Sequence, residues 1–285
     1  TNIKKSVYFS EKAFFYLHLG DLHEPMDVFD NNKYRPFGEV SRLPNIKKWD
    51  YDDGNDISSD EFQDYKQNKL KLYDTALHYV DSQIKGFVDF LRQYNLMEDS
   101  LLVITGDHGE EFWEHTVFEK EMREDPRGVY GVGHGHTLFE ELIRLPLVVI
   151  SDSDQVRTIS PPTSHIDLVP TILSECGIGV EDNFDGESIY ESHDRYIFSE
   201  ELAYGDEMKS GIFRDRKVLY LPVQKTAWET SLKDNEKIEQ YKEVNIKDEM
   251  VQQLIEFSMR GSSNEQNKID IDKKLKDRLK NLGYI

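Results

Sequence analysis

Cysteine and long apolar runs are both scarce in this sequence. The chain has one cysteine, Cys176, which excludes an intrachain disulfide framework and any multi-cysteine zinc site. Cys176 lies in the segment TILSECGIG, on the apolar side of a predicted helix, so we expect a small core residue there and not a nucleophile. No apolar stretch approaches the roughly 20 residues that cross a bilayer, so no transmembrane segment is expected.

Positive charge is also in short supply. The 35 lysines and arginines face 55 aspartates and glutamates, which gives a net charge of −20. A surface of this charge repels nucleic acid and anionic membranes, so neither is an expected partner. A small anionic substrate stays possible, because a bound metal ion can invert the local field.

The length and composition suit a folded protein. With 285 residues, 38% hydrophobic and 12% aromatic, the chain can build one large domain with an appendage. No signal peptide is visible, which favours the cytoplasm while leaving the compartment open. The first residue is Thr1 and not methionine, which suggests a cleaved or truncated chain.

The first two thirds of the chain read as an α/β domain. Branched apolar runs predict buried strands at 13–19, 101–104 and 145–150. Between the first two, apolar residues recur at three- and four-residue steps and predict a helix over 64–94. Strand, helix and strand in this order indicate a parallel crossover unit. A further helix is expected over 164–177, with Asp167 as its N-cap and Gly177 as its end.

From about residue 187 the pattern changes. Short antiparallel strands are predicted at 195–201, 209–222 and 241–245, and amphipathic helices at 248–257 and 272–285. The sequence therefore predicts two domains, a catalytic α/β part over 1–186 and a small α+β subdomain over 187–285.

Three clusters of ionisable side chains lie where predicted strands end or begin. They are His18, Asp21 and His23; Asp107 and His108; and His134 and His136. Ligands bind at the carboxyl ends of strands in open α/β sheets, and imidazole with carboxylate suits zinc, manganese or iron. One aspartate and one histidine need further ligands to hold an ion. The nearby acidic run at 109–115 is expected to be a solvated loop, and the segment 119–133 a charged, mobile one.

Five segments occur in an order typical of one enzyme family. They are YLHLGDLHEPM, YDTALHYVDSQIKGFVDFLRQYNLMEDSLLVITGDHGEEFWEH, GHGHTLFEELIRLPLVVI, SHIDLVPTILSECGI and the terminal LKDRLKNLGYI. In these segments the chain resembles the sulfatases of the alkaline phosphatase superfamily. The resemblance extends over nearly all of residues 13–190, and the tail resembles the small C-terminal subdomain of the same enzymes. The resemblance implies an α/β fold with a mixed central sheet flanked by helices, and a small C-terminal α+β subdomain.

The resemblance also implies roles for the polar clusters. Asp107 and His108 match the pair that ligates one divalent cation in sulfatases, usually Ca²⁺, with Mn²⁺, Mg²⁺ or Zn²⁺ as alternatives. His23 matches the histidine of a D-x-H-x-P motif that contacts the anionic oxygens of the substrate. The implied activity is hydrolysis of a sulfate ester of a small molecule or a glycan.

The match around residue 135 is looser. His134 and His136 flank Gly135, where many sulfatases carry a lysine that contacts the sulfate. Either histidine could take the part of that lysine by donating to the bridging oxygen, and an imidazole can protonate a leaving alkoxide.

The chain departs from the family at the nucleophile. Sulfatases attack with a formylglycine made from the cysteine of a C-x-P-S-R motif, and Cys176 lies in a different context. We therefore expect the nucleophile and about half of the metal ligands in an N-terminal portion that this sequence lacks, and little activity from the chain alone. Two alternatives stay open: a phosphodiesterase or phosphoglycerol-type transferase with a serine or threonine nucleophile, and a catalytically incomplete binding module.

Overall fold

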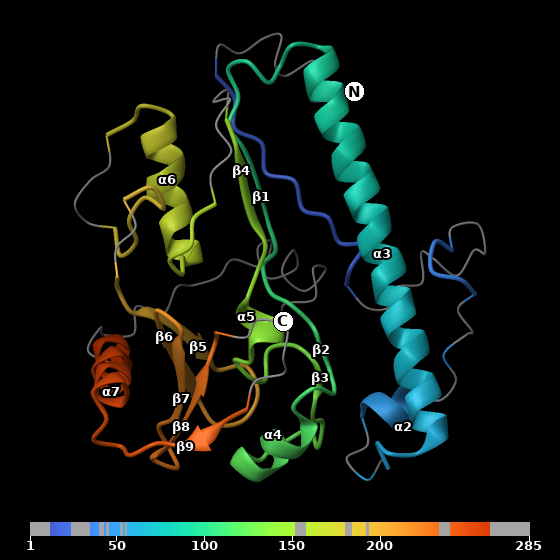
Figure 1. Ribbon diagram of the computed structural model, residues 1–285, viewed down its shortest axis with the longest axis vertical. Coiled ribbons are helices and arrows are strands. Elements are labelled where there is room, and N and C mark those ends of the chain that lie inside the picture. The colour runs from blue at the N-terminus through green and yellow to red at the C-terminus, as the bar shows by residue number, and fades with distance from the viewer. Residues whose placement is uncertain are drawn as a thin grey trace, which may run out of the picture. The chain divides into compact units, whose positions relative to one another are not determined.

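The structure is a computed structural model that describes residues 12–23, 35–39, 43, 46–51, 54, 56–151, 158–179, 184–191, 194–233 and 240–262, with side chains to 259. The chain forms two compact units (Figure 1). The first contains residues 1–133 and 145–157, and the second contains 134–144 and 158–285. The division at 186/187 expected from the sequence stays a prediction.

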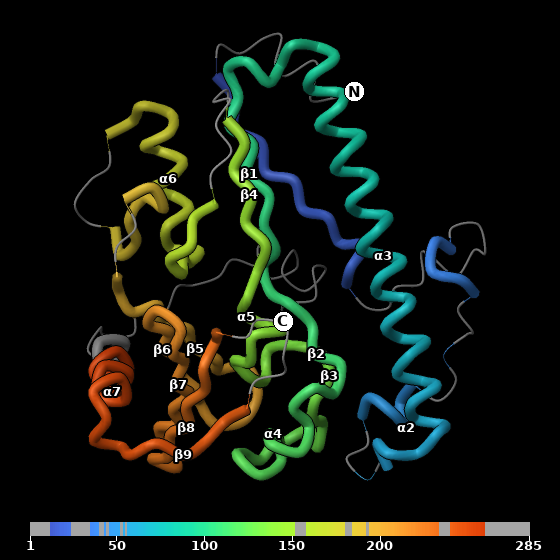
Figure 2. The backbone as a smooth tube through the Cα atoms, viewed as in Figure 1, coloured from blue at the N-terminus to red at the C-terminus, as the bar shows by residue number. Residues whose placement is uncertain are grey.

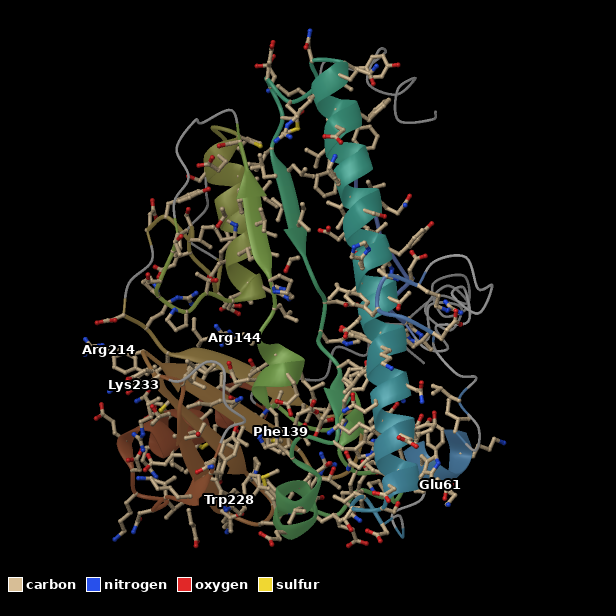
Figure 3. All side chains as sticks on the ribbon, turned by 45° about the vertical axis from the view of Figure 1, so that its right-hand side comes forward. Glu61, Phe139, Arg144, Arg214, Trp228 and Lys233 are labelled. Carbon is tan, nitrogen blue, oxygen red and sulfur yellow. The ribbon has the colours of Figure 1, made fainter. Side chains whose placement is uncertain are left out.

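A long helix, α3 (Asp60–Gln93), is the largest element of the first unit and confirms the helix predicted over 64–94. The Ser59 hydroxyl caps its start by accepting a hydrogen bond from the backbone N–H of Phe62 at 3.2 Å. Asp60 and Glu61 in the first turn place negative charge at the positive end of the helix dipole (Figure 3). No helix among the described residues is both long enough and apolar enough to cross a membrane.

The core of the first unit is aromatic. Helix α2 (Ile46–Asp50) contributes Trp49, whose ring lies 5.4 Å from that of Phe62 on α3. Phe62 in turn contacts Trp113 edge to face, with ring centroids 5.0 Å apart. The buried members of this cluster are Trp49, Phe62, Tyr65, Phe112, Trp113, Val129 and Val132. The cluster joins α3 to the segment that follows the first strand.

Strand β1 (Leu102–Thr105) pairs antiparallel with β4 (Leu147–Ile150). The two predicted strands are therefore present, but the expectation that they are buried on both faces was wrong. Most of their side chains are half-buried, and Val148 is 47% exposed. Among the described residues this sheet has two strands, so neighbouring strands cover neither of its outer edges there.

The predicted buried strand at 13–19 was also wrong. These residues form neither helix nor strand, and Phe14 and Tyr16 are each 79% exposed. A strand needs a neighbour for its backbone N–H and C=O groups, and within the described residues β1 pairs with β4 instead. The predicted parallel crossover from 13–19 to 101–104 is therefore not formed there.

The segment after β1 is a folded hairpin, which corrects two loop predictions. Strand β2 (Glu111–Phe112) pairs with β3 (Val132–Gly133), and helix α4 (Thr116–Met122) lies between them. The acidic run expected to be solvated has Glu111, Phe112, Trp113 and His115 buried. Glu119 is fully buried and accepts a hydrogen bond from the backbone N–H of Gly131 at 2.7 Å. This hydrogen bond offsets part of the cost of burying the carboxylate.

The second unit includes α5 (Glu140–Ile143), the 3₁₀ turn η2 (His165–Asp167) and α6 (Leu168–Glu175). Ser164 and Asp167 form a reciprocal capping box, and the buried Asp167 carboxylate is paired with Arg195. The chain leaves α6 at Gly177, which has the predicted left-handed backbone with φ +65°. Cys176, expected in the core, is exposed, as are Ser174 and Glu175 before it in the last turn of α6.

Five antiparallel strands in sequential order make the sheet of the second unit (Figure 2). They are β5 (Ile197–Glu201), β6 (Met208–Phe213), β7 (Arg216–Leu221), β8 (Thr226–Ser231) and β9 (Lys242–Glu243). Helix α7 (Glu249–Ser262) packs on this sheet, with Leu254 against the bare Cα of Gly211. The antiparallel strands and the helix at 248–257 are confirmed, and the helix expected at 272–285 lies outside the described residues.

The sheet and α5 are tied together inside the second unit. The ammonium of Lys217 on β7, which is fully buried, lies 2.9 Å from the carboxylate of Glu140 on α5. Phe139, the residue before α5, is fully buried and its ring centroid lies 5.7 Å from that of Tyr241 (Figure 3).

Candidate metal centre

The turn after β1 presents Asp107 and His108. The backbone N–H of His108 donates to the Asp107 carboxylate at 3.0 Å, and the His108 Nδ1 atom lies 2.8 Å from the carbonyl oxygen of Gly109. A carbonyl oxygen only accepts, so Nδ1 donates, which leaves Nε2 of a neutral imidazole as the available ligand atom. Metal-ligating histidines commonly hold their second nitrogen in this way.

The β2–β3 pairing brings Glu110 next to His134. Glu111 is opposite Gly133 and Phe112 is opposite Val132, so the next opposed positions along the same register are 110 and 134. His134 directly follows Gly133 in the chain, so the β2–β3 pairing fixes the position of the His134 backbone. The Glu110 carboxylate lies 3.9 Å from the position that a Cβ on Gly133 would occupy, so the glycine leaves room for it.

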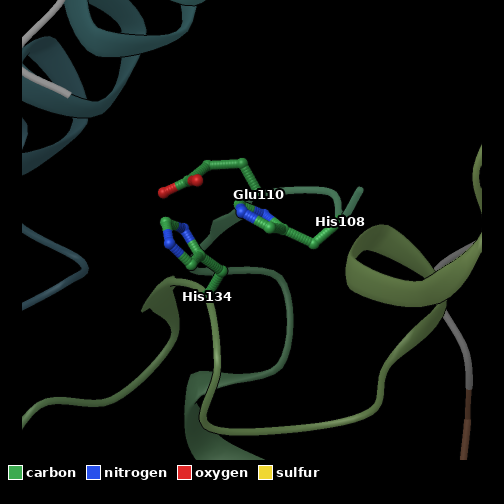
Figure 4. A group of neighbouring side chains, drawn as sticks. All are labelled: His108, Glu110 and His134. Carbon is green, nitrogen blue, oxygen red and sulfur yellow. The ribbon is translucent and has the colours of Figure 1, made fainter. Parts of the chain in front are cut away.

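Three groups of side chains in the described residues could hold a metal ion, and His108, Glu110 and His134 form the one whose members are all half-buried (Figure 4). The other two, Glu111 with Glu119 and His136, and Glu111 with His115 and Glu141, are wholly or mostly buried. In the half-buried group each residue offers one ligand atom, and these atoms lie within 4.8 Å of one another. Two imidazoles and one carboxylate are a donor set that zinc, manganese and iron accept. Partial exposure leaves a metal in such a group open to a further ligand, as catalytic metal sites require.

Sequence reasoning missed Glu110. Glu110 lies in the run 109–115, which was expected to be a solvated loop. Its partner His134 comes only after the long connection 113–131, which contains α4. The sequence does carry one signal for this hairpin, the repeated glycines of GVGHGH. In the structure Gly131, Gly133 and Gly135 all have positive φ angles. Glycines in alternate positions allow the close backbone approach seen at this hairpin.

The two histidines beside Gly135 have different surroundings. Gly135 has φ +74°, which breaks the simple alternation of side chains between the two residues. His134 is half-buried in the candidate group, while His136 is fully buried.

His23 and Asp107 lie outside every three-residue ligand group that the described part of the chain contains. Asp107 is the nearer candidate, since its carboxylate lies 3.8 Å from Nε2 of His108 and its side chain is 56% exposed. His23 is exposed in a turn, where its backbone N–H donates to the carbonyl oxygen of Gly20 at 3.2 Å. His18 of the same cluster is also exposed.

One tyrosine of α3 lies beside this hairpin. The Tyr73 ring meets the Phe112 ring edge to face, with centroids 5.1 Å apart. Burial, followed by the negative charges of Glu110 and Asp74, raises the pKa of the Tyr73 phenol above its ordinary value. The phenol therefore keeps its proton at neutral pH.

Comparison with known proteins identifies relatives of the chain. The uncharacterized sulfatase YidJ of Escherichia coli is 28% identical over 118 residues, which are 41% of this chain and 21% of that protein. The low-salt glycan biosynthesis sulfotransferase Agl7 of Haloferax volcanii is 29% identical over 176 residues, 59% of this chain and 38% of that protein. The chain thus spans less than half the length of these relatives.

Among solved structures, the phosphonate monoester hydrolase SpPMH from Silicibacter pomeroyi matches with a TM-score of 0.52 and 16% identity, over 75% of this chain and 45% of that one. This similarity supports the fold, an α/β arrangement of the alkaline phosphatase type with a strand-rich C-terminal part. The family model described as Sulfatase matches residues 3–178. This match covers more than half of the 285 residues, and the chain belongs to the Sulfatase family.

Proposed function

We propose that the chain carries the metal-binding part of a sulfate ester hydrolase, with a divalent cation held by His108, Glu110 and His134. The observation that carries the proposal is the convergence of these three ligand atoms within 4.8 Å at the end of β1 and on the β2–β3 hairpin. Membership of the Sulfatase family supports hydrolysis of a sulfate ester as the reaction class. It also supports the cation, because sulfatases generally use a divalent metal.

The donor set bears on which cation binds. The family resemblance implies Ca²⁺, which prefers six to eight oxygen ligands. A group with two imidazole nitrogens and one carboxylate favours Mn²⁺ or Zn²⁺ over Ca²⁺. Asp107 is the proposed next ligand, since its carboxylate lies beside His108, and an added oxygen ligand would raise the affinity for Ca²⁺ as well.

The exposure of the three candidate histidines, His23, His134 and His136, suggests a different role for each. A bound cation would supply positive charge to stabilise the charge that develops on the transferred group. His23 is exposed, and in the proposal it contacts anionic oxygens of the substrate. Of the two histidines beside Gly135, His134 has the exposure that a metal or substrate contact needs. The buried His136 needs a local opening before it can protonate a leaving alkoxide.

The nucleophile is proposed to come from outside these 285 residues. The C-x-P-S-R motif is absent from the sequence, and the single cysteine, Cys176, follows α6 of the second unit, where it is exposed. This assignment predicts that the chain binds the cation but turns over little sulfate ester by itself.

Sulfuryl transfer to an acceptor is the second candidate function. The relative Agl7, which matches over 59% of this chain, is named a glycan biosynthesis sulfotransferase. Its name supports a sulfated glycan as the substrate class and an acceptor hydroxyl in place of water. Hydrolysis and transfer share the proposed metal group, so the identity of the acceptor separates them.

The test of the proposal is cation binding by the 285-residue chain. We expect isothermal titration with Mn²⁺ to give one site per chain, and His108→Ala, Glu110→Gln and His134→Ala each to weaken it at least tenfold, about 1.4 kcal/mol. His78→Ala, which removes an exposed histidine of α3, is the matched control and leaves the affinity unchanged. Absence of Mn²⁺ and Zn²⁺ binding by the wild type would overturn the proposal.

A further inference from the structure

We infer that the hydroxyl of Tyr73 donates a hydrogen bond to an oxygen of the anion bound beside His108, Glu110 and His134. The inference rests on the proposed function and deepens it, because it names a substrate-contacting residue that the sequence clusters did not include. Three observations in the first unit carry it.

The first observation is the contact of Tyr73 with the hairpin. Its ring lies 5.1 Å from that of Phe112, at an interplanar angle of 66°. Phe112 follows Glu110 by two residues, so the two share one side of the extended chain. Phe112 is also paired with Val132, two residues before His134. Tyr73 therefore lies against the part of the hairpin that bears two of the proposed ligands.

The second observation is that Tyr73 and the segment that bears His23 both pack against Ala76 of α3. The small cluster around the fully buried Ala76 contains Leu22, Leu72, Tyr73 and Tyr79. Leu22 immediately precedes His23, the residue proposed to contact the substrate anion. Tyr73 also packs against the aromatic cluster that contains Phe112 and Val132 of the hairpin. Among the described residues of α3, it belongs to both clusters. The His23 segment and the hairpin therefore pack on neighbouring positions of α3.

The third observation concerns the hydroxyl itself. The Tyr73 side chain is half-buried, and no hydrogen bond joins its hydroxyl to any other described residue. Tyr65, two turns earlier on α3, shows the opposite arrangement, since its hydroxyl donates to the buried carboxylate of Asp50 at 3.1 Å. A tyrosine that buries its ring and leaves its hydroxyl unused by the protein is suited to contact a ligand.

The chemistry of the site explains why a neutral donor is useful there. Glu110 and the nearby Asp74 carry negative charge, which opposes an incoming anion. A cation in the group would offset that charge, and a protonated phenol adds a directed donor without further charge. Hydrogen bonds to charged groups contribute enough to change an affinity by a factor of about ten or more.

The experiment uses Tyr73→Phe, which keeps the ring and removes the hydroxyl. The probe is inorganic sulfate, titrated calorimetrically into the 285-residue chain loaded with Mn²⁺. We expect Tyr73→Phe to weaken sulfate binding about tenfold and to leave the Mn²⁺ affinity unchanged. Tyr79→Phe is the matched control, because Tyr79 belongs to the same cluster on α3 but has no ring contact with Phe112, and it should bind sulfate as the wild type does.

The outcomes separate the inference from the function on which it rests. Unchanged sulfate affinity in Tyr73→Phe overturns the inference and leaves the metal proposal intact. A parallel loss of Mn²⁺ and sulfate affinity in this variant also overturns it, because Tyr73 would then act on the metal group. Metal-loaded wild-type protein that binds no sulfate overturns the inference as well. A wild type that binds no metal overturns the proposed function instead.

Discussion

The ammonium of Lys69 lies 2.8 Å from the carboxylate of Asp50, and both side chains are almost completely buried. The Asp50 carboxylate also accepts a hydrogen bond from the hydroxyl of Tyr65. Lys69 lies 5.5 Å from the centre of the Trp113 ring, next to the hairpin that bears Glu110. This buried pair therefore connects α2 and α3, and it lies beside Trp113, within the first unit.

Breaking this pair should destabilise the protein strongly. Lys69→Met leaves the Asp50 charge buried without its partner, and we expect the free energy of unfolding in urea to fall by about 3–5 kcal/mol. Lys85→Met is the control, since it removes an exposed pair with Asp89 on the same helix and should cost less than about 1 kcal/mol. Equal losses in the two variants would contradict the structural role of the buried pair.

Gly131 should tolerate no side chain. Its φ is +74°, and an added Cβ would lie 1.9 Å from Oγ1 of Thr116 at the start of α4. We expect Gly131→Ala to lower the free energy of unfolding by more than the roughly 1–2 kcal/mol that a left-handed alanine costs by itself. Because Gly131 precedes β3, the same substitution should weaken Mn²⁺ binding by moving His134.

Gly128→Ala supplies the comparison for Gly131. Gly128 has a similar φ of +67°, but no atom lies within 4 Å of the position that a Cβ on this glycine would occupy. The difference between the two variants in urea unfolding therefore measures the clash with Thr116 alone. If Gly128→Ala were as destabilised as Gly131→Ala, the close approach of β3 and α4 would be wrong.

Local patterns in the sequence were enough for much of the fold. The periodicity over 64–94 predicts α3 because helix contacts are three and four residues apart. Short connections join β5 to β8 of the second unit, so the order of these strands also follows from neighbouring segments. Gly177 was identified correctly as a helix end, because a left-handed backbone at a helix end favours glycine whatever its distant contacts.

The failures all depend on contacts between distant segments. Residues 13–19 have the composition of a buried strand, but a strand forms only where a partner is present. The run 109–115 is rich in charge, yet Glu111 and His115 are buried where β2 pairs with β3 and α4 begins. Glu110 could not be identified from spacing, since the register that places it opposite residue 134 spans the whole α4 connection.

The salt bridge in the connection between α4 and β3 should depend on pH. Burial raises the pKa of the Asp125 carboxyl, but hydrogen bonds from the Arg127 side chain and backbone, with the charges of Arg127 and Arg123, outweigh it and leave the pKa below its ordinary value. A folded pKa below the unfolded one gives stability that is present at neutral pH. That stability is lost as the pH falls through the folded value.

Asp125→Asn should therefore be less stable than the wild type at neutral pH, and the difference should shrink as the solution is acidified below the ordinary pKa of an aspartate, about 3.9. Urea unfolding of both proteins across this range measures it. A destabilisation that is the same in neutral and in acidic solution would show that Asp125 acts through neutral hydrogen bonds and not through its charge.

Asp107, which the family resemblance implies as a metal ligand, can be tested by comparing two cations. Its carboxylate lies beside His108, but it is outside the group that His108 forms with Glu110 and His134. If it ligates the cation, Asp107→Ala should weaken Ca²⁺ binding more than Mn²⁺ binding, because the oxygen ligand contributes most to the harder ion. Titration of both ions into this variant and into Asp81→Ala, which removes an exposed carboxylate of α3, makes the comparison. If Asp107→Ala binds both ions like the Asp81 control, the cation is held without it and the pair implied by the family resemblance reduces to His108.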